Sequence, residues 1–223
     1  MQHDVAIVGF GPVGQTLAAL LGTRGHRVVA IEKFAEIYPL PRAVRLDGEI
    51  MRTFQQLGIV GEIEHELVAG DRYVWYGADG GIILDIPTTQ AHPSGWSLSY
   101  LFHQPTVEAA LDARARREPT VTVERGWVVD GLRQDSDGVT LTMRPAAGDS
   151  DARSVRARYV VGCDGANSFV RDAAGIARTD LGFAEPWIVI DARPHDMADF
   201  AHLPSAAQHC DPRRSGDLAR PRL

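Results

Sequence analysis

The first thirty-three residues contain the feature that most constrains the fold. Val5–Val8 is a continuous apolar run, which is typical of a strand buried on both faces of a sheet. A GxGxxG pattern, Gly9 to Gly14, follows directly, and after it comes a stretch with leucines at helical spacing. A second apolar run ends in Glu32, 18 positions after Gly14. This order predicts a strand, a glycine-rich turn, a helix and a second strand that ends in an acid.

Each part of this order has a physical role in a dinucleotide site. Gly9 permits the tight turn, Gly11 lets the backbone approach a pyrophosphate, and Gly14 lets the helix pack close to the strand. The helix N-terminus presents N–H groups to the phosphates. Glu32 can accept hydrogen bonds from ribose hydroxyls, and its charge disfavours a 2′-phosphate on the nucleotide bound there. The alternative is a glycine-rich turn in an unrelated α/β protein.

Composition narrows the class of protein. With 223 residues, 44% of them hydrophobic and 23% charged, the chain can bury a core in one large or two small domains. A net charge of -6 predicts no nucleic-acid surface. Two cysteines, Cys163 and Cys210, favour a reducing compartment. The short N-terminal apolar run lacks a preceding basic region, so we expect a cytoplasmic protein without membrane partners. The eight histidines show no metal-ligand spacing, which predicts no metal.

The segment after Glu32 predicts a loop and then a helix. Prolines place Arg42 and Arg45 in the loop, where both could simply be solvated charges. Asp47 is a plausible helix N-cap. Behind it lies an apolar stripe of Ile50, Met51, Phe54 and Leu57.

Residues 71–103 change in character, with β-like runs at Tyr73–Tyr76 and Ile82–Ile86. The aromatic residues Trp75, Tyr76 and Trp96 could line a pocket, although such side chains are more often core. A helix is expected next, with Pro105 in its first turn and Gln104 at its entrance as a cap or a polar surface residue.

From Val121 onward the pattern favours strands. Asp137-Gly138 is a hairpin signal, and the strand over 154–162 leads into Asp164-Gly165. A short helix over 166–175 and a further strand over 186–194 are expected. Asp-Gly is a common turn dipeptide, so on its own it indicates no more than a turn.

The combination of these segments resembles a known family. The GxGxxG with its acid, "PRAVRLDGEIMR", "FHQPTVEAAL" and "CDGANSFVR" together resemble the single-component, FAD-dependent aromatic hydroxylases, the class A flavoprotein monooxygenases. "PWIVID" and "CDPRR" resemble the 3-(3-hydroxyphenyl)propionate hydroxylase branch. The resemblance runs from residue 4 to about residue 214.

The resemblance implies roles for individual residues. It puts Asp164 and Gly165 near the FAD pyrophosphate and Glu32 on the adenosine ribose. It also puts Gln104 in contact with FAD, together with one arginine, for which Arg42 is the first choice and Arg45 the second. It implies no catalytic residue that can be named. The candidate cofactor-binding residues are Gly9, Gly11, Pro12, Val13, Gly14, Glu32, Lys33, Arg42, Arg45, Gln104, Asp164 and Gly165.

The resemblance also implies a fold and an activity. We expect a Rossmann-like α/β domain for FAD and NAD(P), formed by 1–70 and 104–180, with 71–103 and 181–223 as pieces of a β-rich substrate domain. NADH or NADPH would reduce FAD, and reduced flavin with dioxygen would hydroxylate a small phenolic substrate.

The sequence departs from the family in two respects. Family members are longer and carry a second FAD motif, Gly-Asp followed by Pro, whereas none of the pairs beginning at Gly70, Gly148 and Gly216 has that context. We therefore interpret the chain as the N-terminal part of a hydroxylase, shortened by a frameshift after Arg214. Two alternatives remain open: a truncated, inactive chain that at most binds FAD, and an NAD-dependent dehydrogenase.

Overall fold

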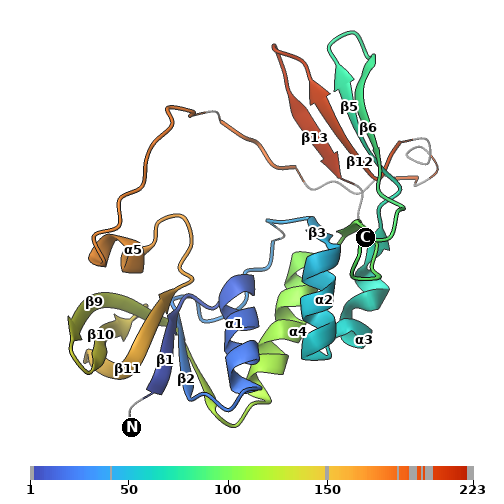
Figure 1. Cartoon of the computed structure of the whole chain (residues 1–223). Coiled ribbons are helices and arrows are strands. Elements are labelled where there is room, and N and C mark those ends of the chain that lie inside the picture. The colour runs from blue at the N-terminus through green and yellow to red at the C-terminus, as the bar shows by residue number, and fades with distance from the viewer. Residues whose placement is uncertain are drawn as a thin grey trace. The chain divides into compact units, whose positions relative to one another are not determined.

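The protein divides into two compact units (Figure 1). The computed structural model describes residues 3–40, 42–148, 151–184, 186–190, 195–196, 198 and 203–219. Unit 1 comprises Met1–Leu40 and Val107–Leu181, and unit 2 comprises Pro41–Thr106 and Gly182–Leu223. The long helix α4 (Gln104–Arg116) begins in unit 2 and continues in unit 1.

Unit 1 is built on a six-stranded sheet in the order β8-β2-β1-β11-β10-β9. The first four of these strands are parallel, and β10 and β9 join as an antiparallel hairpin extension. The hairpin forms at the predicted signal, with Ser136 and Asp137 as its two turn residues and Gly138 as the first residue of β10. The elements of unit 1 are β1 (His3–Val8), α1 (Pro12–Gly22), β2 (Val28–Glu32), β8 (Val121–Arg125), β9 (Trp127–Asp135), β10 (Gly138–Pro145), β11 (Arg153–Gly162) and α5 (Phe169–Ala173).

The core of unit 1 explains why its central strands are apolar on both faces. Alternate residues of β1 and β2, including Val8 and Ile31, belong to one buried cluster with Leu141 and Met143 of β10. On the opposite face, Ile7 packs against Gly14 at the start of α1. A strand covered on both faces can only be a continuous apolar run. The predicted Rossmann-like α/β fold is therefore confirmed.

Unit 2 contains two small sheets. One has the order β13-β12-β5-β6, in which β12 pairs parallel with β5, and the other has the order β3-β7-β4. Asp47 caps α2 by accepting the backbone N–H of Ile50 at 3.0 Å, which confirms the predicted N-cap. The elements of unit 2 are β3 (Arg45–Asp47), α2 (Gly48–Leu57), α3 (Val60–Ile63), the short 3-10 helix η1 (Glu64–Glu66), β4 (Val68–Ala69), β5 (Arg72–Gly77), β6 (Ile82–Pro87), β7 (Ser99–Leu101), β12 (Ala206–Cys210) and β13 (Gly216–Ala219).

Three expectations from the sequence are wrong here. Arg45 lies in β3 rather than in a loop, because β7, more than fifty residues later, pairs with it. Ile50 is exposed, since the apolar face of α2 is narrower than the predicted stripe. The described part of the predicted strand over 186–194, Pro186–Ile190, is not a strand, and Trp187 to Ile190 are at least 65% exposed. No described strand pairs with it, so it cannot form a ladder. Residues 191–194 lie outside the described residues.

Candidate functional site

The glycine-rich turn follows β1 as predicted. Gly9 has a φ of 94°, and its N–H donates to the carbonyl of Ile31 at 2.8 Å. A Cβ at Gly9 would lie 2.4 Å from the backbone oxygen of Cys163. Only glycine fits both this left-handed backbone and this close approach. The turn is therefore held against the end of β11 as well as against β2.

Gly11 and Gly14 have different surroundings. A Cβ at Gly14 would lie 2.1 Å from the carbonyl oxygen of Gly9, whereas a Cβ at Gly11 would meet nothing within 4 Å. Gly14 is thus required for packing of α1 on the turn, and Gly11 leaves open space in front of the helix. Gly11 is the N-cap of α1 and supplies no side-chain acceptor, Pro12 stands at the first position, and Val13 is 70% exposed. The helix N-terminus therefore keeps N–H groups available for an anion.

Glu32 closes the turn from the end of β2. One carboxylate oxygen accepts the backbone N–H of Phe10 at 2.7 Å, and the other accepts the N–H of Phe34 at 3.0 Å. Glu32 is buried, while Lys33 beside it is exposed with its ammonium 5.0 Å from the ring centroid of Phe34. Each carboxylate oxygen retains a second acceptor position, so the group can still receive a ribose hydroxyl.

Arg125 is a neighbour of this site that the sequence reasoning missed. It ends β8 and stands opposite Glu32 in the register of β2 and β8. Its guanidinium donates to Asp112 of α4 at 3.0 Å and lies 5.3 Å from the ring centroid of Phe10. Asp112 also accepts from Arg116 at 2.8 Å. A sequence signal for Arg125 exists: it is the last residue of β8, the strand that pairs with β2, and β2 ends in Glu32.

The Asp164 motif meets the glycine turn. The N–H of Cys163 donates to the carbonyl of Val8 at 2.7 Å, and a Cβ at Gly9 would lie 2.8 Å from the Cα of Asp164. Parallel pairing of β1 with β11 produces this approach, because the carboxyl ends of both strands then lie at the same edge.

The carboxylate of Asp164 organises the start of α5. It accepts the Ser168 hydroxyl and the N–H of Val170, the latter at 3.1 Å, while Ser168 caps the helix through Arg171 N–H at 3.0 Å. Gly165 beside it has a φ of 81°, a backbone that favours glycine. Asp164 therefore fixes the turn that follows β11.

The neighbouring Cys163 carries a free thiol. Burial raises its pKa, and the nearby charge of Asp164 raises it further. Both effects disfavour the thiolate, in line with the interpretation of Cys163 as a small packed residue rather than a nucleophile.

The other candidate residues belong to unit 2. Gln104 accepts two backbone N–H groups through its side-chain oxygen, from Arg42 at 2.9 Å and from Ala43 at 2.7 Å. It therefore fixes the segment that contains Arg42. Arg45 directs its guanidinium to the Ser99 hydroxyl and over the ring of Tyr73.

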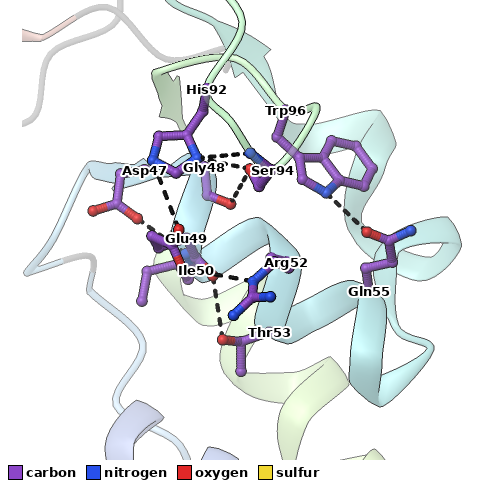
Figure 2. Close-up of polar contacts among 10 residues, drawn as sticks. All are labelled: Asp47, Gly48, Glu49, Ile50, Arg52, Thr53, Gln55, His92, Ser94 and Trp96. Atoms are coloured by element: carbon purple, nitrogen blue, oxygen red, sulfur yellow. Dashed lines mark hydrogen bonds and ion pairs between the residues drawn. The ribbon is translucent and has the colours of Figure 1, made fainter.

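A polar network in unit 2 fixes the start of α2, just after Arg45 and Leu46 (Figure 2). Nδ1 of His92 lies 2.9 Å from the Ser94 hydroxyl, which donates to the carbonyl of Gly48 at 3.0 Å. Nε2 of His92 lies 3.7 Å from the carboxylate of Glu49. A Cβ at Gly48 would lie 2.7 Å from Cβ of His92, so the loop packs directly on the helix. Trp96 ties the same loop to Gln55 through a 3.1 Å hydrogen bond.

Trp75, Tyr76 and Trp96, which the sequence suggested as a possible pocket lining, do not lie on one common surface. Trp75 and Tyr76 are successive residues of β5, so their side chains point to opposite faces of the sheet. Tyr76 stacks on His209, with the ring centroids 5.3 Å apart. Trp96 belongs to the loop that packs on α2 (Figure 2).

The described residues contain neither a metal-binding cluster nor a membrane-spanning helix. Among them, no three His, Cys, Asp or Glu side chains gather closely enough to hold a metal ion. Within the same residues, no helix has both the length and the apolar character needed to cross a membrane.

Comparisons with known proteins agree with the site. Residues 2–213 match the family described as "FAD binding domain". A "probable NADH-specific resorcinol 4-hydroxylase" of Rhodococcus jostii (strain RHA1) is 43% identical over 209 residues, which are 94% of this chain and 39% of the relative. A "3-(3-hydroxy-phenyl)propionate/3-hydroxycinnamic acid hydroxylase" of Comamonas testosteroni is 36% identical over 95% of this chain and 35% of the relative.

A solved structure shows the same fold. The p-nitrophenol 4-monooxygenase of Pseudomonas putida DLL-E4 superposes with a TM-score of 0.78 over 98% of this chain and 54% of its own, at 24% identity. The chain thus spans less than two fifths of the length of these two curated relatives. The match over residues 2–213 shows that this chain belongs to the FAD-binding domain family, and the glycine turn with its open Gly11 and the buried Glu32 agree with that assignment.

Proposed function

We propose that unit 1 binds the adenosine and pyrophosphate of FAD, and that the chain forms the cofactor-binding part of an NADH-dependent hydroxylase of small phenols. The observation that carries the proposal is the open space in front of Gly11, beside the uncapped N-terminus of α1. A backbone that a phosphate can approach closely, at the positive end of a helix dipole, is what a pyrophosphate requires.

The residues of unit 1 fit the cofactor. Gly9 and Gly14 shape the turn, Glu32 offers acceptor positions for ribose hydroxyls, and Asp164 with Gly165 forms the adjoining edge. When bound, FAD supplies hydride acceptance and oxygen activation, while the protein orients it and excludes water. The cofactor contacts of Arg42 and Gln104 stay predictions from the family resemblance; within unit 2, Gln104 holds the segment that contains Arg42. We also propose that the backbone of Pro12, Val13 and Lys33 contacts the cofactor beside the glycine turn and Glu32.

The reaction class comes from the relatives. One relative is named as NADH-specific and acting on resorcinol, and others as acting on 3-(3-hydroxyphenyl)propionate. Both substrates are small phenols, so we infer a small phenolic substrate with dioxygen as co-substrate. NADH is the inferred donor. The assignment of 1–70 with 104–180 to the cofactor domain, and of 71–103 with 181–223 to the substrate domain, stays a prediction.

Two measurements on the purified 223-residue chain test the proposal. The first is a titration with FAD followed by flavin fluorescence, with FMN as the control that lacks the adenosine half. We expect saturable binding of FAD and not of FMN. The second is NADH consumption by the FAD-loaded chain, with and without resorcinol or 3-(3-hydroxyphenyl)propionate. Stimulation by either phenol supports the hydroxylase, binding without stimulation supports a cofactor-binding chain without turnover, and no FAD binding overturns the proposal.

A further inference from the structure

A pocket of about 250 Å³ lies within unit 2 and is lined by Arg45, Leu46, Asp47, Leu98 and Ser99. The lining combines one cation, one carboxylate, one hydroxyl and two leucines. From its geometry we propose that it holds the carboxylate of an aromatic acid, with Arg45 and Ser99 as the anchoring residues. This inference rests on the proposed function, because it names the class of phenol that the hydroxylase would take.

The charge of Arg45 is the first argument. Among the described residues, the guanidinium has no carboxylate within ion-pair distance, and its hydrogen bonds go to the neutral Ser99 hydroxyl, at 3.3 Å from Nε and 3.1 Å from Nη2. A half-buried cation without an acidic partner costs desolvation energy, and an anionic ligand would offset that cost. A planar guanidinium also matches the two oxygens of a carboxylate.

The second argument is that Arg45 is held in place before any ligand binds. Its guanidinium lies 4.4 Å from the ring centroid of Tyr73, a cation–π contact. The Tyr73 hydroxyl in turn donates to the side chain of Gln208 at 2.9 Å, so β12 fixes the ring. A donor whose rotamer is already fixed loses less entropy on binding.

The third argument concerns the neighbouring groups. Ser99 is buried and accepts both hydrogen bonds from Arg45, so its own O–H can be donated to a ligand oxygen. The carboxylate of Asp47 accepts the N–H of Ile50 at the start of α2, where the helix dipole stabilises its charge. Leu46 and Leu98 supply the apolar part of the lining for a ring.

The test compares two ligands with and without the carboxylate, 3-(3-hydroxyphenyl)propionate and 3-ethylphenol. Binding of each to the chain is measured by ligand-observed NMR, without FAD, so the result does not depend on turnover. We expect Arg45→Met to raise the Kd of the acid tenfold or more and to leave the Kd of 3-ethylphenol within twofold. Ser99→Ala should raise the Kd of the acid severalfold. Arg52→Met, at an exposed arginine of α2, is the matched control and should change neither.

The outcomes separate this inference from the proposed function. Equal binding of the acid by the wild type and Arg45→Met overturns the inference, as does an equal loss for both ligands. A loss of FAD affinity in Arg45→Met, with acid binding unchanged, also overturns the inference. Arg45 would then be assigned to cofactor binding. If Arg45→Met does not fold, Ser99→Ala and Arg45→Lys decide the question. The Kd of the acid must then rise severalfold in Ser99→Ala, and it must rise less in Arg45→Lys than in Ser99→Ala. Failure of the wild type to bind FAD overturns the proposed function and leaves the acid titration interpretable.

Discussion

The carboxylate of Glu32 accepts the backbone N–H of Phe10 at 2.7 Å, which joins the end of β2 to the middle of the glycine turn. One side chain thus shapes the turn and offers acceptor positions to the ribose. We expect Glu32→Ala to weaken FAD binding about 10- to 100-fold, because hydrogen bonds to a charged group contribute roughly 1.5–3 kcal/mol. Glu32→Gln keeps one acceptor oxygen and should lose less. Fluorescence titration with FAD measures both, and an unchanged affinity in Glu32→Ala would remove Glu32 from the site.

Gly14 and Gly11 form a matched pair for separating packing from binding. A methyl group at Gly14 would overlap the carbonyl oxygen of Gly9, so Gly14→Ala should destabilise unit 1 by about 3 kcal/mol, a fall in Tm of roughly 6–12 °C. A methyl at Gly11 meets nothing, so Gly11→Ala should keep its Tm while losing FAD affinity. Thermal unfolding and FAD titration of both variants test this. Equal loss of stability in both would contradict the assignment.

Gln104 should control the order of the segment that contains Arg42. Gln104→Ala removes the side-chain oxygen that accepts from the N–H groups of Arg42 and Ala43, which costs roughly 0.5–1.5 kcal/mol for each hydrogen bond lost. Limited proteolysis should then cut near Ala43 faster than in the wild type. Gln104→Glu retains an acceptor oxygen and serves as the control. Identical cleavage rates for the alanine variant and the wild type would show that Gln104 does not fix this segment.

The pair of Asp4 and Arg27 predicts how the thermal stability of the protein changes with pH. Hydrogen bonds from Arg27 lower the pKa of Asp4 to about 2, well below an unfolded value of about 3.9. A carboxylate with a lowered pKa stabilises the fold above its unfolded pKa, and this contribution disappears as the pH falls through the folded pKa. The difference in Tm between the wild type and Asp4→Asn should therefore be constant above pH 5 and shrink between about pH 4 and pH 2. A difference that does not change over that range would contradict the role of this pair.

The sequence predicts the first half of the site well, because its signals are local. The apolar run before Gly9, the spacing to Gly14 and the acid at Glu32 all belong to one βαβ unit, and the observed strands and turn follow that order. The family resemblance implies that Asp164 lies near the FAD pyrophosphate, and parallel pairing of β1 with β11 brings Asp164 beside Gly9 in the structure.

Contacts between distant segments could not be predicted in the same way. Arg125 reaches Phe10 only because β8 pairs in register with β2, and Arg45 is a strand residue only because β7 pairs with it. The apolar run from Trp187 has the composition of a strand, yet composition does not supply a pairing partner. Pairing depends on the whole sheet, which no short segment encodes.

The cofactor site is tested most directly by the affinity of the 223-residue chain for FAD, measured side by side for the wild type and Gly11→Ala. Thermal unfolding of both proteins is the control for folding. We expect saturable binding of FAD by the wild type, no binding of FMN, and an FAD affinity that falls tenfold or more in Gly11→Ala at unchanged Tm. Binding of FAD that is equally tight in both proteins, or absent from a folded wild type, would contradict the claim that the glycine turn of unit 1 is the cofactor site.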